Sequence, residues 1–148
     1  MIVIPATAPD IASWLELVSQ VEPLFGGMPM FDVSLKAKIA EGAALCVRAA
    51  DGGVLGGVLL GGEAPDNWIR WLAVRTSARR RGIGAALLGE VLLRWPAPCT
   101  ISLATFGEDN VEGCPARRLY ERFGFVAGEM LPRGPEGGAR QRYTLVRP

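Results

Sequence analysis

The chain has 148 residues, which suits one compact domain with a sizeable core. Hydrophobic residues make up 49% and charged residues 21%, the composition of a globular protein and not of a disordered chain. The net charge of +1 excludes the broad positive surface that neutralises many nucleic-acid phosphates. We therefore expect residues 1–148 to form a single folded domain with no nucleic-acid partner.

The cysteine and histidine content excludes several kinds of site. Cys46, Cys99 and Cys114 are odd in number and widely spaced, and the chain has no histidine. A zinc site, a disulfide framework and histidine-based catalysis are therefore not expected. We expect no bound metal.

The N-terminus and the hydropathy pattern predict the compartment. Residues 1–10 lack the basic start and the long apolar run of a signal peptide. No stretch approaches the roughly 20 apolar residues of a membrane span. We expect a cytoplasmic protein without membrane contact.

Two helices are predicted near the N-terminus, after a first strand. Pro9 and Asp10 favour the first turn of a helix, which Pro23 and Gly26-Gly27 are expected to end. The apolar residues of this helix recur at helical spacing: Ile11, Trp14, Leu15, Val18 and Val21. A second helix is expected over about residues 31–41.

Three strands are predicted next. Two short apolar runs, 44–49 and 54–60, flank the letters Asp-Gly-Gly and predict an antiparallel hairpin. Residues 68–74 form the clearest strand, because aromatic and branched side chains are frequent in them.

The C-terminal half alternates between helical and strand patterns. An amphipathic helix is predicted from Gly84 to Trp95, followed by a strand over 101–106. A short helix over 116–123 and two last strands, 125–130 and 141–146, complete the chain. This order of elements predicts a mixed α/β sheet.

Three consecutive arginines, Arg79 to Arg81, stand directly before Gly82-Ile83-Gly84 at the start of the predicted helix. Glycines let a ligand approach the backbone, and the first turn of a helix offers unpaired N–H donors at the positive end of its dipole. The arginine side chains add positive charge. The segment therefore predicts an anion site.

Three other interpretations of this segment can be compared with its sequence. A dinucleotide-binding loop needs Gly-x-Gly-x-x-Gly, and Leu87 stands where the third glycine belongs. A phosphate-binding loop needs Gly-Lys-Ser or Gly-Lys-Thr, which the chain lacks. A glycine turn beside solvated arginines requires no ligand, and it stays open.

The segment resembles the signature of the GCN5-related N-acetyltransferases, the GNAT family. That signature is Gln or Arg, two residues, Gly, one residue, then Gly or Ala, and here it reads Arg79-Arg80-Arg81-Gly82-Ile83-Gly84. Residues 71–74 resemble the family's fourth strand, and 85–92 resemble the helix that follows it. A second block, 116–125, resembles the C-terminal motif. The resemblance implies a mixed, mostly antiparallel central sheet flanked by helices.

The resemblance also implies an acetyl-CoA site. In similar proteins the end of the fourth strand pairs with the pantetheine arm, which points to Leu72, Ala73 and Val74. The pyrophosphate lies on the signature loop, which points to Arg79, Arg80, Arg81, Gly82, Ile83, Gly84 and Ala85. Asn110 resembles an asparagine that precedes the C-terminal helix in the family, but it lies further from Tyr120 than usual.

Tyr120 matches the family tyrosine near the thioester sulfur, which acts as a general acid toward the departing thiolate. A phenol suits that task because it can donate a proton and is neutral at pH 7. The alternative is that Tyr120 is a core residue, since it shares a helix face with Leu119 and Phe123.

The chain departs from the family at the general base. The family often carries a carboxylate on the fourth or fifth strand, where this chain has Arg70 and Ser102. Glu63, Asp66 and Glu108 are expected in loops close to strand ends and could act through water, or they are simply solvated. We assign no base from the sequence.

The last predicted helix carries Arg117, Arg118 and Arg122. These residues are expected to make its exposed side basic, either as a solvated face or as a contact to the 3′-phosphate of CoA.

The resemblance predicts an acetyl-CoA-dependent N-acetyltransferase that works by direct transfer to a primary amine. The acceptor, a small-molecule or peptide amine, would be shaped by residues 14–31 and the last hairpin, which could equally form a homodimer contact. One alternative is a non-catalytic acyl-CoA-binding sensor domain, which the missing base permits. A nucleotide-binding domain is the other, and the absent third glycine argues against it.

Overall fold

Seven strands form one continuous sheet in the computed structural model, which describes residues 1–148. The strands are β1 (Ile4–Pro5), β2 (Ala44–Arg48), β3 (Val54–Glu63), β4 (Asp66–Val74), β5 (Cys99–Phe106), β6 (Val126–Leu131) and β7 (Arg140–Arg147). Their spatial order is β1-β2-β3-β4-β5-β7-β6. All neighbours run antiparallel except β4 and β5, which run parallel. The predicted mixed, mostly antiparallel sheet is confirmed.

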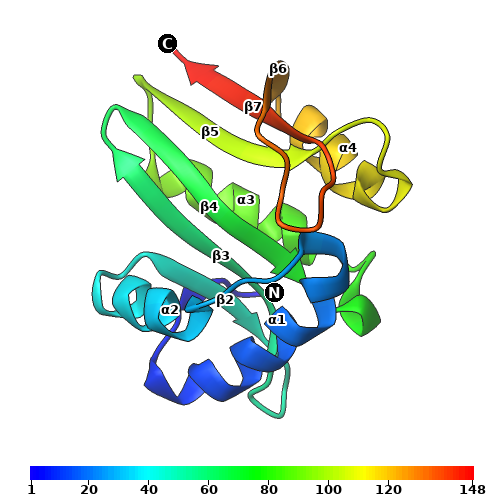
Figure 1. Ribbon diagram of the computed structural model, residues 1–148. Helices are drawn as coiled ribbons and strands as arrows, with labels where there is room; N and C mark the ends of the chain where they lie inside the picture. The colour runs from blue at the N-terminus through cyan, green and yellow to red at the C-terminus, as the bar shows by residue number, and fades with distance from the viewer.

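Four α-helices cover the two faces of this sheet (Figure 1). They are α1 (Ile11–Phe25), α2 (Phe31–Ala40), α3 (Ile83–Arg94) and α4 (Cys114–Arg122), and three short 3₁₀ turns are η1 (Ala8–Asp10), η2 (Thr76–Ala78) and η3 (Val111–Gly113). One buried cluster joins α3 and α4 to the sheet, and another joins α1 and α2 to it. We call the two sides the α3–α4 face and the α1–α2 face. None of the helices is long and apolar enough to span a bilayer.

Of the residues predicted to end α1, Gly26 does so and Pro23 does not, because the helix continues through Pro23 to Phe25. Proline has no N–H, so the helix loses the bond to the carbonyl of Ser19. Ser19 is exposed, and water can satisfy that carbonyl. Gly26, at a φ of 86°, then ends the helix, and its N–H donates to the carbonyl of Glu22.

A β-bulge in β4 changes which face its side chains meet. Ile69 pairs with Leu60 and Trp71 pairs with Leu59, so Arg70 is an extra residue in β4. Before the bulge Ile69 belongs to the cluster on the α3–α4 face, and after it Trp71 belongs to the cluster on the α1–α2 face. No local sequence pattern indicates this bulge.

The parallel strands β4 and β5 stay together for only four residue pairs, from Asp66–Thr100 to Ile69–Leu103. Beyond these pairs they diverge toward their C-terminal ends (Figure 1). Each strand remains paired on its outer side, β4 with β3 to Val74 and β5 with β7 to Phe106. The facing edges of β4 and β5 are therefore unpaired beyond Ile69 and Leu103, and we call this unpaired stretch of the sheet the opening.

The core on the α1–α2 face depends on a glycine in β3. Trp14 of α1 is fully buried and lies against Gly57. A Cβ atom at Gly57 would stand 2.5 Å from two ring carbons of Trp14. The absence of a side chain at Gly57 thus sets how closely α1 approaches the sheet.

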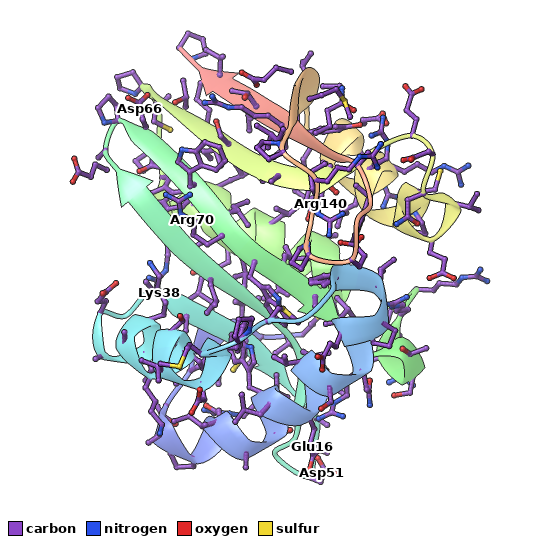
Figure 2. All side chains as sticks on the ribbon, viewed as in Figure 1. Glu16, Lys38, Asp51, Asp66, Arg70 and Arg140 are labelled. Atoms are coloured by element: carbon purple, nitrogen blue, oxygen red, sulfur yellow. The ribbon has the colours of Figure 1, made fainter.

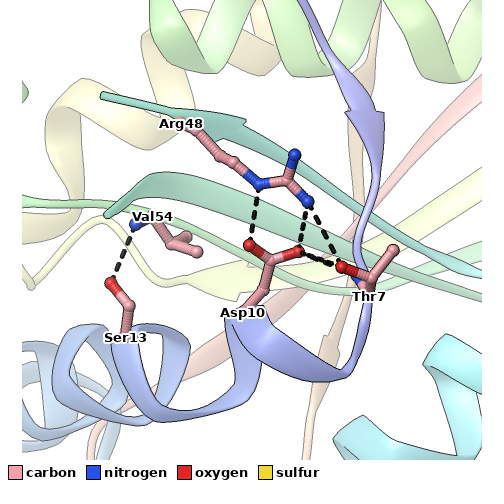
Figure 3. Close-up of polar contacts among 5 residues, drawn as sticks. All are labelled: Thr7, Asp10, Ser13, Arg48 and Val54. Atoms are coloured by element: carbon pink, nitrogen blue, oxygen red, sulfur yellow. Dashed lines mark hydrogen bonds and ion pairs between the residues drawn. The ribbon is translucent and has the colours of Figure 1, made fainter. Parts of the chain in front are cut away.

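An ion pair joins the start of α1 to β2 (Figure 3). The Asp10 carboxylate accepts from Arg48 Nε at 2.7 Å and from a second guanidinium nitrogen at 2.6 Å. It also accepts from the N–H of Thr7 at 2.8 Å. Asp10 is buried, and the hydrogen bonds from Arg48 hold its pKa below the usual 3.8.

We predict that Gly57→Ala lowers the free energy of unfolding by about 1–3 kcal/mol, because the new methyl group overpacks the site beside Trp14. The measurement is a urea titration of both proteins. Gly89→Ala in α3 is the matched control: a Cβ there meets nothing within 4 Å, so the higher helix propensity of alanine should stabilise by up to about 1 kcal/mol. Equal stability of Gly57→Ala and wild type would contradict the packing argument.

We predict that Asp10→Asn costs about 2 kcal/mol of stability at pH 7, because it removes the charge that Arg48 binds. The pKa of Asp10 is lowered in the folded state, so its stabilisation is present above about pH 4 and is lost as the pH falls through the folded pKa. Urea titrations between pH 3 and 7 should show the gap between the two proteins narrowing below about pH 4. A gap that stays constant over this range would refute a role for ionisation of Asp10.

Candidate functional site

Six consecutive backbone N–H groups at the start of α3 have no acceptor within the protein. They belong to residues 80–85, and the first bonded amide after them is that of Ala86, which donates to the carbonyl of Gly82. Arg80 and Gly82 both adopt positive φ angles, of 65° and 79°. Left-handed residues of this kind turn successive N–H groups toward one concave side, which suits an anion. No side chain caps the helix at Gly82.

Positive charge surrounds these amides. Arg79, Arg80 and Arg81 are all exposed, and none of them pairs with a carboxylate within 4.0 Å. Arg79 Nε donates to the carbonyl of Val74 at 3.4 Å. The N-terminal end of the α3 dipole adds to the field of the arginines. The structure thus brings the predicted signature residues together as one electropositive loop.

The end of β4 borders this loop and the opening between β4 and β5. The Arg75 N–H donates to the carbonyl of Leu55 in β3, at 2.7 Å. Since antiparallel strands alternate their bonding direction, the backbone polar groups of Leu72 and Val74 point away from β3 and toward the opening. An extended ligand lying in the opening could hydrogen-bond to them.

Arg75 fixes the position of this strand end. Its Nε donates to the carbonyl of Val54 at 2.6 Å, and another of its nitrogens donates to the carbonyl and the hydroxyl oxygens of Ser13, both at 3.0 Å. These bonds join β4 to β3 and to α1.

Tyr120 lies in α4, in the buried cluster that also contains Ile83 of α3. Its ring contacts Phe125 and Tyr143, with ring centres 5.9 and 6.3 Å apart. Burial raises the pKa of the Tyr120 hydroxyl, so the group stays protonated at neutral pH. Three fully enclosed side-chain atoms lack a hydrogen-bond partner: Trp14 Nε1, Trp71 Nε1 and Tyr143 Oη. The Tyr120 hydroxyl is not among them.

Both interpretations of Tyr120 are compatible with this position. The ring packs in the core, and the hydroxyl keeps an uncommitted proton. Gly84 lets α4 approach the start of α3, because a Cβ there would lie 2.9 Å from Leu119 Cδ2. Residues that are 36 positions apart in sequence, Gly84 and Tyr120, therefore belong to elements in direct contact.

One expectation about the region around α4 is wrong, and another stays untested. Arg117 is buried instead of exposed, and it donates to the carbonyl of Phe106 at 2.8 Å and to Gln141 Oε1 at 3.0 Å. Only Arg118 and Arg122 remain exposed as predicted. Asn110 uses its side-chain oxygen to accept from the N–H of Gly113, which caps η3. Its cofactor role stays a prediction.

The carboxylates near the strand ends have other partners or are solvated. Asp66 accepts from Thr100 Oγ1 at 2.9 Å. Glu108 is 88% exposed and lies 3.7 Å from the Arg117 guanidinium. Glu63 is exposed.

Arg140 is a structurally important residue that no sequence pattern indicates. It joins the start of β7 to the end of α1. Arg140 binds both carboxylate oxygens of Glu136 and the carbonyl of Phe25, and it lies 4.8 Å from the ring centre of Phe106. These contacts hold the β6–β7 loop against the end of α1 (Figure 1). No local pattern links positions 25 and 140, so the sequence offered no signal for them.

A surface hollow lies elsewhere and is lined by none of the predicted site residues. It measures about 550 Å³ and is bounded by the end of α2, the β3–β4 hairpin and the end of α3. An opening between strands that a long, flexible ligand would fill is less enclosed than such a hollow. We therefore place the candidate site by the free amides and the diverging strands.

Comparisons with known proteins show which family and which fold this chain resembles. A family model described as "Acetyltransferase (GNAT) domain" matches residues 41–127, which include β4, the arginine-glycine loop, α3 and α4. A search of curated protein sequences finds no significant match.

Solved structures share the whole fold. Ard1 from Thermoplasma volcanium superposes with a TM-score of 0.80 at 18% identity, covering 99% of this chain and 97% of that one. A GNAT-family acetyltransferase from Bacillus cereus gives 0.75 at 19% identity, with coverage of 99% and 97%. The ribosomal-protein-S18-alanine N-acetyltransferase from Escherichia coli gives 0.77 at 14% identity, with coverage of 99% and 93%.

The family model spans more than half of the chain and includes the loop of free amides, and the full-length structural matches show the same fold. The chain therefore belongs to the GNAT family of N-acetyltransferases.

Proposed function

We propose that residues 1–148 act as one domain that transfers an acetyl group from acetyl-CoA directly to a primary amine. The observation that carries this proposal is the run of six unpartnered N–H groups beside the opening between β4 and β5. Family membership supports the use of acetyl-CoA, and a solved structure with the same fold, the NatC complex, is described as bound to a Gag peptide and CoA.

The signature loop would hold the pyrophosphate of the co-substrate. The amides of residues 80–85 would donate to its oxygens, and the exposed arginines beside them would offset its charge. Gly82 leaves the backbone open, since a Cβ there would meet nothing within 4 Å. The pantetheine arm would extend along β4 and pair with the polar groups of Leu72 and Val74.

The transfer needs an oxyanion donor and a proton donor. Acetyl-CoA supplies the thioester whose acetyl group moves. A β4 amide that points into the opening would donate to the carbonyl oxygen as it gains negative charge. Tyr120 would give its proton to the sulfur as the carbon–sulfur bond breaks and the carbon–nitrogen bond forms. The surplus proton on the nitrogen would leave to solvent, since no side chain is assigned as base.

The acceptor is proposed to be a small-molecule or peptide amine. Two proteins with this fold are named for peptide or protein contacts, the NatC complex with its Gag peptide and the S18-alanine N-acetyltransferase. The aromatic residues at the end of α1 and the start of α2, Phe25 and Phe31, pack on Trp71 of β4, at ring-centre distances of 5.9 and 5.1 Å. They would form the apolar wall of the acceptor site.

A non-catalytic acyl-CoA sensor is the second candidate function. It is favoured by one observation: Arg70 and Ser102 stand where a strand carboxylate is common in the family, and Glu63 and Glu108 are exposed to solvent. Such a protein would bind acetyl-CoA and transfer nothing, so turnover on any amine separates the two functions.

We predict that acetyl-CoA and CoA raise the thermal unfolding midpoint, whereas NAD and ATP do not. A ligand at 100 times its Kd adds roughly 2.7 kcal/mol to the stability, enough for a shift of several degrees in a domain of this size. Gly82→Val is the matched variant, since a branched residue at a φ of 79° would distort the loop of free amides and reduce the shift. The absence of a shift with saturating acetyl-CoA would exclude the co-substrate.

We predict that Tyr120→Phe lowers kcat about 100-fold, because the departing sulfur loses its proton donor, while the Kd of acetyl-CoA changes little. Steady-state kinetics and a binding titration measure the two quantities. Tyr143→Phe is the control, since it removes a buried hydroxyl that has no partner and should leave kcat unchanged. Unchanged turnover in Tyr120→Phe would leave Tyr120 as a core residue only.

A further inference from the structure

Part of the α1–α2 face carries no helix. In front of the first half of β4, and of β5 and β7, the sheet is open on that side (Figure 1). Trp68 of β4 lies here, half-buried, directly opposite Ser102 of β5 in the register of the strands. The guanidinium carbons of Arg70 and Arg142 lie 5.0 and 4.8 Å from the centre of the Trp68 ring. Two cations therefore share one aromatic side chain.

Arg70 of β4 follows Ile69, which faces α3 and α4, and therefore points to this side of the sheet. A Cβ at Gly61 of β3 would lie 2.9 Å from Arg70 Cγ and Nε and 3.3 Å from Lys38 Nζ. Arg70 and Lys38 thus converge above Gly61, and Figure 2 shows both on the open face below Asp66. The missing side chain at Gly61 makes room for this approach.

The charge of this group is poorly balanced by the protein. Arg70 forms no hydrogen bond, and no carboxylate lies within 4.0 Å of it. The carboxylates nearest to Arg142 and Lys38 are Glu129 at 3.9 Å and Glu41 at 3.8 Å, each 61% exposed. Such exposed, distant pairs contribute little. Three cations with two weak partners favour the binding of an anion.

Arg142 is held in place for such a contact. Its Nε and one terminal nitrogen donate to Ser102 Oγ at 3.3 and 3.0 Å. The other terminal nitrogen forms no hydrogen bond within the protein. A guanidinium fixed through one edge, with donors left over, is suited to bind a carboxylate or phosphate.

The cation group lies next to the proposed reaction centre. Trp68 and Ser102 form the pair directly before Ile69 and Leu103, where β4 and β5 separate. Leu72, whose amide points into the opening, follows Arg70 by two residues, which is about 7 Å along a strand. An acceptor with its amine in the opening would reach the cations with a group one or two residues away.

We propose that the acceptor of this enzyme carries an anionic group, a carboxylate or a phosphate, that binds Arg70 and Arg142 beside Trp68. This inference rests on the proposed transfer to an amine and names the class of amine. The cations would lower the KM for acidic acceptors and select them over neutral acceptors of the same size.

The test uses tripeptide acceptors with a free N-terminal amine and an amidated C-terminus. The second residue is glutamate, glutamine, phosphoserine or serine, so each acid has a neutral match and the two acids distinguish carboxylate from phosphate. Wild type is expected to show a KM at least about ten-fold lower for one acid than for its neutral match, as charge-assisted hydrogen bonds predict. Arg70→Gln and Arg142→Gln should each reduce this ratio toward one.

Two controls make the outcome decisive. Lys36→Gln removes a positive charge from the exposed side of α2 and should leave the ratio of neutral to acidic KM unchanged. Arg142→Lys should keep only part of this ratio, because lysine has the charge but not the planar guanidinium. Equal KM values for acidic and neutral peptides in wild type, or a ratio that survives Arg70→Gln, would overturn the inference while the transfer itself stands. Acetyl-CoA binding without turnover on any of the four peptides, or on their free amino-acid counterparts, would overturn the proposed function and the inference with it.

Discussion

The structure depends on one constraint, the early end of the pairing between β4 and β5. The two strands share only four residue pairs, yet each is paired along its other edge, so neither can move to close the gap. Arg75 adds bonds to Val54 and Ser13 that hold the end of β4 to its outer neighbours. The backbone groups of β4 that face the gap consequently lack a strand partner, in a place where helices cover the sheet from both sides. An extended ligand is the natural partner for such an edge, since buried peptide groups are costly when unpaired.

The bulge at Arg70 and three glycines adapt the sheet to this opening. The bulge shifts the side-chain alternation of β4 by one residue, which places Trp71 under α1 and α2 and leaves Leu72 and Val74 packed toward α3. The ring of Trp14 packs against Gly57, the side chain of Arg70 against Gly61, and the side chain of Leu119 against Gly84. In each case a side chain from another element occupies the space that a Cβ would take. The close approach of the helices, and with it the shape of the site, follows from backbone left bare at these points.

The elements with strong local periodicity could be predicted from the sequence, and the contacts between distant residues could not. The strand before the arginines and the helix after the glycines show their patterns within a dozen residues, so their types and order agree with the structure. The prediction that Pro23 helps to end α1 is wrong, because a proline near a helix end removes only one backbone hydrogen bond. The carbonyl that loses this bond, that of Ser19, is exposed to water. Arg117 is buried because it finds Phe106 and Gln141, which belong to two other strands. The bulge at Arg70 has no local signature, so the cluster around Trp68 was out of reach of sequence reasoning.

The two buried clusters on opposite faces of the sheet share no residue. One includes residues of α3 and α4, which carry the end of the arginine-glycine loop and Tyr120, and the other includes residues of α1 and α2. Mutations that are far apart and share no partners add nearly independently in their effects on stability. The fold therefore consists of two packing units: residues between Ile11 and Ala40 can be changed with little effect on the packing behind the arginine-glycine loop, provided that Ser13 and its bonds to Arg75 are kept.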